Sequence, residues 1–563
     1  MDGCAFVSLG DDTGDFLTYK VKVTDLSITR RDGTVAKLLP AATTVDFAQY
    51  TSLSEFLTLA AVPAGDYLSG SITLDFTGSD IKAQDASGNA VKLRAVGSSG
   101  KPLGNLTVAI TLDADHPIGL FPGTPHVFGI DFDLNASSTI NSNNTVTVDP
   151  FLVASVDSQT ASSEEVRGSL SGTGTGSFTL GLQPFRGGSG GYGNVVVHSE
   201  PSTIYVVNQK VYFGTSGIAA LAAAGNAPAV LVQGSFNFGS HRFVATQVMA
   251  GSSVPGGTKD AVEGVVISRS GNTLTLLGST LYHTSHSVVF NDTAKVTLAN
   301  STAVRNIESP RTAGSIANIS VGQRVLVFGK FDSATSSTLN AAGGFALLEF
   351  TDVDGSVLSL VDAGTNSSVN LDVQTIGGRP ISMFDFTGTN SDPTNYEVAL
   401  PCSCLNTGVN IGDPVIVSGF AAKFGVAPPD FNANALTDFN LADSVISATW
   451  PSGTANAFTS IEASSGIVVN LSSSPAVHSL REGAEVSDLN TLPSVPAVVT
   501  KDLGVFAILK GGNVQLFVNF KAFVSALNSD LSGGAKVKGF FAVGGYDSAD
   551  SLLETTQVAV ILK

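Results

Sequence analysis

The chain has 563 residues, of which 43% are hydrophobic and only 13% are charged, against about 25% charged in an ordinary soluble domain. Its 47 acidic and 29 basic residues give a net charge of −18, which argues against binding to nucleic acid and against docking on anionic lipid through a basic face. No run of about 18 apolar residues occurs, so the sequence predicts no transmembrane segment. Seven His, three Cys and one Trp leave few candidates for a catalytic site, and we expect the protein not to be an enzyme.

Short runs rich in Val, Ile, Phe and Thr, bounded by Gly, Asn, Asp and Ser, recur along the whole chain and predict an all-β protein. The first of these runs are 5–9, 19–28, 67–76, 106–112 and 145–153. In the second run, Tyr19, Val21 and Val23 alternate with polar residues, which is the period of a half-buried strand. Helical patterns are few and short, and the best candidates are 54–59, 217–224 and 520–527.

From residue 158 onward one pattern occurs four times, namely a Val-rich strand, a Gly, an aromatic residue and a strand that returns the chain. The glycines of the four copies are predicted at Gly234, Gly329, Gly419 and Gly539, the last directly before Phe540. Such repetition is typical of tandem modules, and a small sheet closed on itself hides edges that would otherwise pair between molecules. We therefore predict about four small β-barrel modules from residue 158 onward, rather than one large irregular sandwich. The predicted domains are 1–157, 158–255, 256–350, 351–440 and 441–563.

Two sets of motifs resemble known families. The sequence Val-Ser-Leu-Gly-Asp-Asp-Thr-Gly-Asp-Phe at 7–16 and Gly-Ile-Asp-Phe-Asp at 129–133 are similar to an uncharacterised domain family near the N-terminus of bacterial envelope lipoproteins. The pattern Gly-x-x-Val-x-Val-x-Gly-x-Phe, clearest at 322–331, resembles the hallmark of an uncharacterised family of small, usually secreted bacterial β-barrel modules. The first resemblance covers 4–157 and the second 166–563. They imply a β-sandwich followed by barrels, and they supply no catalytic residue.

The cysteines bear on the cellular compartment. Cys4 follows Gly3, as the lipid-bearing first residue of a bacterial lipoprotein would, but Asp2 and the lack of an apolar signal region fit this poorly, and a small buried residue in the first strand is the alternative. Cys402 and Cys404 could form a local disulfide, bind a metal with other ligands, or stay reduced. The low charge and high Ser, Thr, Asn and Gly content predict an extracellular or cell-envelope protein.

Candidate sites for chemistry are sparse. Asp11, Asp12 and Asp15 are a candidate Ca²⁺ site, because hard cations take several oxygen ligands, although their spacing differs from that of an EF-hand and Asp12 alternatively caps a turn. His283 and His286 would point to opposite faces of a strand, so we interpret them as a surface pair without function. A hydrolase in the last module would require His478, Arg481 and Glu482 to meet in one pocket.

These observations favour a non-enzymatic structural protein of the cell surface, acting in adhesion, in a matrix or as a filament subunit, and associating with itself or with other surface components. A terminal strand of one subunit can complete a sheet in the next. The candidate donor residues are Ala5, Phe6, Val7, Val560 and Ile561. We expect removal of residues 1–10 to leave the modules folded and to abolish assembly. The alternative is a carbohydrate- or calcium-binding envelope lipoprotein, with Ca²⁺ as the sole candidate cofactor.

Overall fold

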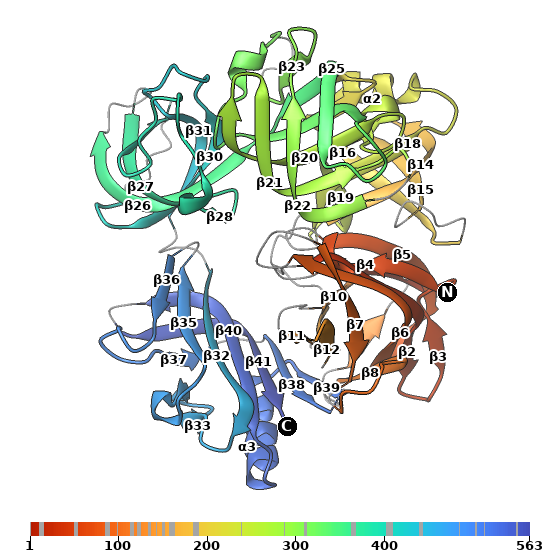
Figure 1. The fold of residues 1–563 in the computed structure, drawn as a ribbon. Coiled ribbons are helices and arrows are strands. Elements are labelled where there is room, and N and C mark those ends of the chain that lie inside the picture. Colours follow the sequence, from red (N-terminus) through yellow and green to blue (C-terminus); the bar gives the residue numbers. More distant parts are fainter. Residues whose placement is uncertain are drawn as a thin grey trace. The chain divides into compact units, whose positions relative to one another are not determined.

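Over the described residues, most of the chain is in strands and the two α-helices are short, which confirms the all-β prediction (Figure 1). By its contacts the chain forms two compact units, the first comprising Met1–Thr258, Thr284–Asn291 and Leu509–Phe517, and the second Lys259–His283, Asp292–Ile508 and Val518–Lys563. The structure, a computed structural model, describes residues 2–10, 16–49, 54–84, 90–97, 99–112, 117–120, 125–132, 137–141, 143–148, 152–156, 164–183, 191–237, 239–285, 288–308, 312–361, 367–400, 409–438, 443–482, 485–500, 504–511, 513–547 and 550–563.

The N-terminal region contains two sheets. The N-terminal part of the first sheet consists of β1 (Asp2–Gly10), β5 (Ser54–Pro63), β10 (Pro125–Phe132) and β13 (Leu152–Val156), and the sheet continues where β5 pairs in parallel with β14 (Glu164–Gly174). Strand β1 lies between β5, which is antiparallel to it, and β10, which is parallel. The predicted helix at 54–59 was therefore wrong, because these residues form part of β5 and pair with β1. A short apolar run of this length fits either a strand or a helix, and tertiary pairing decides between them.

The second sheet is built around the long strands β2 and β6. Its strands are β2 (Phe16–Arg30), β3 (Val35–Lys37), β4 (Thr43–Asp46), β6 (Gly65–Gln84), β7 (Ala90–Val96), β8 (Asn105–Leu112), β9 (Ile118–Leu120), β11 (Ser138–Asn141) and β12 (Thr145–Val148). Strand β2 pairs with β6 along most of its length, with several bulges. Tyr19, Val21 and Val23 are buried whereas Lys22 is exposed, as the alternating pattern predicted. The Tyr19 ring contacts the rings of Phe16 and Phe76 edge to face.

Three closed five-stranded barrels follow. The first consists of β14 (Glu164–Gly174), β15 (Ser177–Leu182), β16 (Asn194–Val207), β18 (Ala229–Asn237) and β19 (Arg242–Ala250), with β17 (Lys210–Phe213) beside β16. The second consists of β20 (Asp260–Ser270), β21 (Thr273–Tyr282), β22 (Val288–Thr297), β24 (Arg324–Phe331) and β25 (Thr338–Leu348), with β23 (Ala303–Asn306) beside β25. The third consists of β26 (Thr351–Val361), β27 (Ser367–Ile376), β29 (Tyr396–Leu400), β30 (Pro414–Ala421) and β31 (Phe431–Asp438), with β28 (Arg379–Pro380) beside β27.

All three barrels share one topology. Numbered within each barrel, the strand order is 1-2-3-5-4, and strand 4 closes the barrel against strand 1. Strands 3 and 5 are parallel in each barrel. This arrangement is that of a small Greek-key barrel of the OB type. A fold of this kind carries many unrelated functions, so it does not by itself assign one.

The fourth module keeps part of this topology and adds strands to it. They are β32 (Asp443–Thr454), β33 (Phe458–Glu462), β34 (Gly466–Val469), β35 (Val477–Glu482), β36 (Glu485–Asp488), β37 (Ala497–Val499), β38 (Val505–Lys510), β39 (Asn513–Phe517), β40 (Val537–Asp547) and β41 (Leu552–Leu562). Strand β32 pairs with β40, β40 with β41, and β41 lies parallel to β37. Helix α3 (Phe520–Ser532) precedes β40, as α2 (Gly214–Ala222) precedes strand 4 of the first barrel.

The hallmark glycine marks a β-bulge between strands 4 and 5. At Gly234, Gly329 and Gly419 the strand register shifts, and a Cβ atom would lie 2.1–2.3 Å from a carbonyl oxygen of strand 5. In the fourth module the same register shift and the same close approach occur at Gly544. The repeat in that module therefore aligns at Gly544 and Tyr546, not at Gly539 and Phe540, as the sequence pattern had suggested. Glycine is required here because backbone of the neighbouring strand occupies the space of a side chain.

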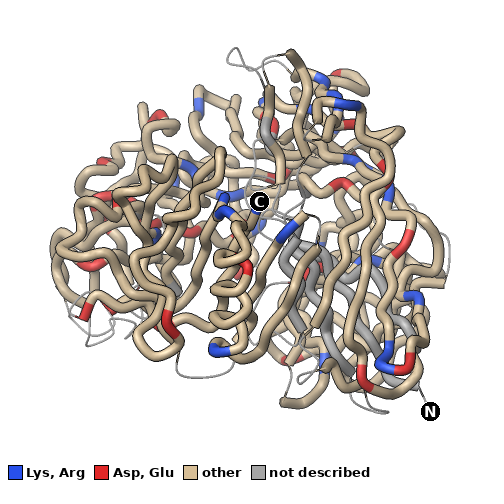
Figure 2. The backbone as a smooth tube through the Cα atoms, turned by 90° about the horizontal axis from the view of Figure 1, so that it is seen from below, with Lys and Arg blue, Asp and Glu red and all other residues tan. Residues whose placement is uncertain are grey.

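Charged residues are sparse along the backbone. Figure 2 shows Lys and Arg, and Asp and Glu, as short separate stretches on a largely uncharged tube, in keeping with the charged fraction of 13%. Within the described part of the chain, no helix combines the length and the apolar character that a membrane crossing requires.

Candidate functional site

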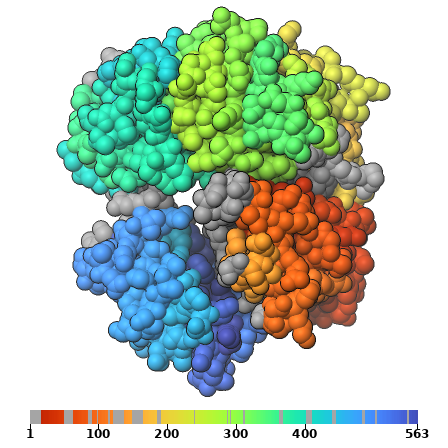
Figure 3. All heavy atoms as spheres, in the orientation of Figure 1, coloured from red at the N-terminus to blue at the C-terminus, as the bar shows by residue number. Residues whose placement is uncertain are grey.

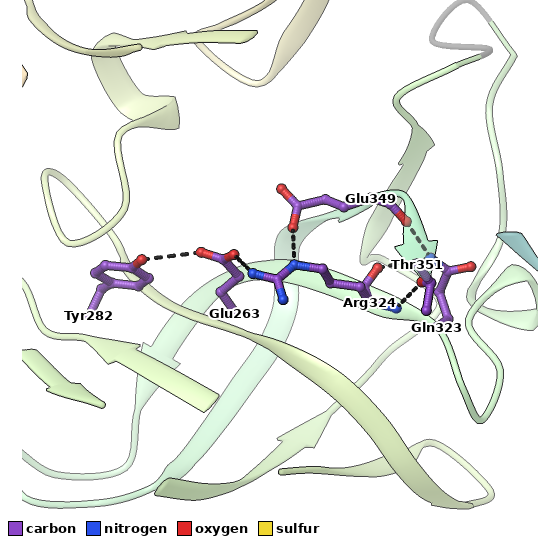
Figure 4. Close-up of polar contacts among 6 residues, drawn as sticks. All are labelled: Glu263, Tyr282, Gln323, Arg324, Glu349 and Thr351. Carbon is purple, nitrogen blue, oxygen red and sulfur yellow. Dashed lines mark hydrogen bonds and ion pairs between the residues drawn. The ribbon is translucent and has the colours of Figure 1, made fainter. Parts of the chain in front are cut away.

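An ion-pair network joins three strands of the second barrel (Figure 4). The guanidinium of Arg324, on β24, is hydrogen-bonded to Glu263 of β20, and its Nε lies 3.6 Å from Oε2 of Glu349, directly after β25. Tyr282 donates its hydroxyl to Glu263 at 3.1 Å. The charge of Glu263, and to a lesser extent that of Glu349, raises the pKa of the Arg324 guanidinium, against the opposing effect of burial. Because the Arg324 side chain is 40% exposed, we expect the network to contribute about 1 kcal/mol or less.

Beside this network, the side chain of Gln323 connects the second barrel to the third. Gln323 is completely buried, and its Oε1 accepts a hydrogen bond from the backbone N–H of Ala421, at the end of β30. Its Nε2 lies 2.7 Å from Glu349 O, 2.9 Å from Arg324 O and 3.2 Å from Thr351 Oγ1. Thr351 begins β26, and its hydroxyl also accepts the backbone N–H of Arg324 at 2.7 Å. One buried amide thus satisfies backbone groups of both barrels.

Apolar and aromatic contacts complete this junction. Val265 of β20 belongs to the hydrophobic core of the third barrel, together with Ile376 and Tyr396. The guanidinium carbon of Arg269 lies 4.5 Å from the centre of the Phe424 ring, which is within the range of a cation–π interaction. In the space-filling view the second barrel (green) and the third (teal) form a continuous surface (Figure 3). The second and third barrels therefore share a hydrophobic core and are not independent domains joined by a flexible linker.

The polar groups of the junction are paired within the protein. The Arg324 guanidinium faces two carboxylates, and the polar atoms of Gln323 and Thr351 are used to satisfy backbone groups. Across the described ranges of the chain, no three or more His, Cys, Asp or Glu side chains form a group that could hold a metal ion.

Several sequence-predicted site residues fall outside the described ranges. These are Asp11, Asp12 and Asp15 of the candidate Ca²⁺ site, both members of the Cys402 and Cys404 pair, and His286. The Ca²⁺ and disulfide predictions stay predictions. Cys4 lies in β1, as a residue of the first strand.

The candidate donor strands are both paired within the chain. Ala5, Phe6 and Val7 lie in β1, where each pairs with a residue of β5 on one side and of β10 on the other. Val560 and Ile561 lie in β41 and pair with β40. Donation of either segment to another molecule would require it first to leave its own sheet.

His283 differs from its interpretation as a surface residue. His283 is buried, with its ring centre 4.2 Å from that of Phe331, so the interpretation was wrong for this residue. Burial lowers the pKa of His283, while the charge of Asp260 opposes this effect. Phe331, the aromatic residue of the hallmark motif, lies against the imidazole of His283. The spacing of His283 and His286 in the sequence did not indicate this contact.

His478 and Arg481 do not converge on one site. They are three residues apart on β35, so their side chains leave opposite faces of the strand, and Arg481 is exposed. His478 instead pairs with Asp488 of β36, with Nε2 3.2 Å from Oδ1.

No protein-family model, curated protein or solved structure matches this chain. Gln323 and Thr351 were missed by sequence reasoning, although Gln323 stands inside the hallmark, at the first variable position after Gly322. A glutamine beside a Val-rich buried strand is the one signal that could have indicated it.

Proposed function

We propose that this chain is a non-enzymatic structural protein of the extracellular space or the bacterial cell surface, in which closed barrels serve as stiff spacers. The observation that carries the proposal is the junction at Gln323, where two successive barrels share buried hydrogen bonds and a hydrophobic core. A spacer must resist bending between its modules, and a shared core provides that resistance. Closed barrels also remove free strand edges, which suits a protein exposed at high local concentration.

The composition supports the same proposal. Low charge, abundant Gly, Ser, Thr and Asn, and the resemblance to secreted bacterial modules favour a location outside the cytoplasm. The role that fits best is adhesion, matrix formation or filament assembly, through association with other copies or with other surface components.

Negative-stain electron microscopy of the purified full-length chain tests this proposal, combined with light scattering over a range of protein concentrations. We expect concentration-dependent assemblies that keep the same form after chelation of divalent cations. Particles that stay monomeric at every concentration, and that release or absorb heat when Ca²⁺ or oligosaccharides are titrated in, would instead support the calcium- or carbohydrate-binding alternative.

A further inference from the structure

Part of a hairpin in the fourth module belongs, by its contacts, to the first compact unit. Strands β38 and β39 form this hairpin, and at its base the Gly504 N–H donates to Val518 O at 3.1 Å. Residues Leu509–Phe517 belong by their contacts to the first unit, whereas the residues immediately before and after them belong to the second. We call residues 509–517 the arm.

The arm adds a strand to the N-terminal sheet. Strand β39 runs parallel to β8, with Asn513 opposite Ala109 and Leu516 opposite Leu112. On its other side β8 pairs with β6 in antiparallel register. The contact with the arm spans four residue pairs, while β8 is eight residues long. Parallel pairing is slightly weaker per residue than antiparallel pairing, so this contact is a modest one.

The arm has the side-chain pattern of a strand that covers a sheet edge. Val514 and Leu516 are buried, whereas Asn513 and Gln515 are exposed. Two apolar side chains and a short row of backbone hydrogen bonds therefore hold a segment that is about 400 residues away in sequence from its partner strand. The same contacts are available to the arm of a second, identical chain, and exchange of an identical element costs little free energy.

We propose that the arm is exchangeable, and that the β8 edge of one copy accepts β39 of a second copy when the protein self-associates. Reciprocal exchange between two copies gives a closed dimer, and one-way exchange gives an open chain of subunits. This inference rests on the self-association in the proposed function and assigns it to a defined strand and a defined edge.

Cysteine cross-linking tests the exchange. Thr111 and Gln515 are opposite each other in the register and both are exposed. In a background with Cys4, Cys402 and Cys404 replaced by Ser, one chain carries Thr111→Cys and another carries Gln515→Cys. After the two are mixed and oxidised, we expect a disulfide-linked dimer on a non-reducing gel, in a yield that rises with protein concentration. A single chain with both substitutions is expected to cross-link internally when dilute.

A matched control uses Asn105→Cys in place of Thr111→Cys, since residue 105 lies six positions along β8 from the partner of Gln515 and should give no dimer. The proposal is overturned if the mixture gives no dimer at concentrations where the doubly substituted chain cross-links internally, or if that chain does not cross-link internally at all. Assemblies seen by electron microscopy without the cross-linked dimer would reject arm exchange while leaving the structural function standing. Absence of both would reject both.

Discussion

Asp46, the last residue of β4, is a carboxylate buried against the N-terminal core. Its Oδ1 accepts the backbone N–H of Tyr19 at 2.7 Å, and its Oδ2 lies 3.8 Å from Lys20 Nζ without a hydrogen-bond partner among the described residues. Burial raises the pKa of Asp46 to about 6, although the hydrogen bond from Tyr19 and the charge of Lys20 act in the opposite direction. An unfolded Asp ionises near 3.9.

Because the folded pKa is the higher one, the native state holds the proton more tightly, and the free energy of unfolding falls as pH rises from about 4 to about 6. Asp46→Asn keeps an acceptor for Tyr19 and removes the buried charge. We expect it to stabilise the N-terminal region by about 2–3 kcal/mol at pH 7 and hardly at all at pH 4. Urea unfolding at both pH values, with hydrogen exchange of β2 as the local readout, measures this. Destabilisation at pH 7 would show that the ion pair with Lys20 outweighs burial.

Gln323 gives a second prediction at the level of a single side chain. Gln323→Leu keeps the volume but leaves the buried N–H of Ala421 without its acceptor, so we expect a loss of about 1–3 kcal/mol in the free energy of unfolding of the joined barrels. Calorimetry should then show the second and third barrels melting in separate transitions. Gln233→Leu, at a half-buried position on β18 of the first barrel, is the control and should leave that cooperativity intact.

A double-mutant cycle separates the energetic contribution of the hydrogen bond between Gln323 and Thr351 from that of the other contacts at the junction. If the Gln323 amide and the Thr351 hydroxyl act together, Thr351→Ala should cost less in the Gln323→Leu background than alone. Strict additivity of the two losses would contradict a shared network.

At the scale of elements, the turn between β27 and β28 fixes how closely the third barrel approaches the second. Gly377 and Gly378 both have positive φ, at 56° and 71°. A Cβ on Gly377 would lie 2.5 Å from Cγ2 of Val265, whereas a Cβ on Gly378 would meet no atom within 4 Å. A side chain at either position would therefore have the same unfavourable backbone conformation, but only a side chain at Gly377 would also clash with Val265 across the junction.

We expect Gly378→Ala to cost about 1 kcal/mol, from positive φ alone, and Gly377→Ala to cost about 1–3 kcal/mol more because it also overpacks Val265. Thermal unfolding of the two variants measures the difference. A Val265→Ala change makes room for the new methyl group and should recover part of the loss in Gly377→Ala but none in Gly378→Ala. Equal losses in both glycine variants would mean that the turn does not bear on the junction.

Strands and barrels were predictable from the sequence because their signals are local. Alternation identified β2, and the repeated Val-rich strand with its glycine identified three of the four copies of strand 4, because the bulge requires glycine in each. In the fourth copy, Gly539 and Phe540 match the motif in sequence but do not occupy its position in the fold. The register of β40 with β41 was needed to identify Gly544 as the glycine of the bulge.

What the sequence could not indicate depends on contacts between distant segments. The buried amide of Gln323 looks like any polar residue beside a strand until Ala421 and Thr351 are placed around it. The arm carries only the ordinary alternation of a short strand, and no local signal marks β8 as its partner. Both features on which the proposals rest therefore required the three-dimensional structure.

At the scale of the whole molecule, removal of the N-terminal residues tests the stability of the first sheet, because β1 is a central strand of it. Strand β1 has partners on both sides, so removing residues 1–10 would leave β5 and β10 each with an unpaired edge. We expect the truncated chain to lose the first sheet of the N-terminal region while the joined second and third barrels stay folded. Limited proteolysis should then cut within 54–63 and 125–132, and leave the strands of the second and third barrels, 260–438, resistant.

A synthetic peptide of residues 2–10 is the control, because it should restore protection if the loss is that of a missing central strand. Unchanged resistance of β5 and β10 after truncation would show that β1 is dispensable for its sheet and free to serve as a donor. If protection is lost, an accompanying loss of assembly reports unfolding of the sheet rather than removal of a donor strand. Arm exchange through β39 can then be judged separately, since its cross-linking assay keeps residues 1–10 in place.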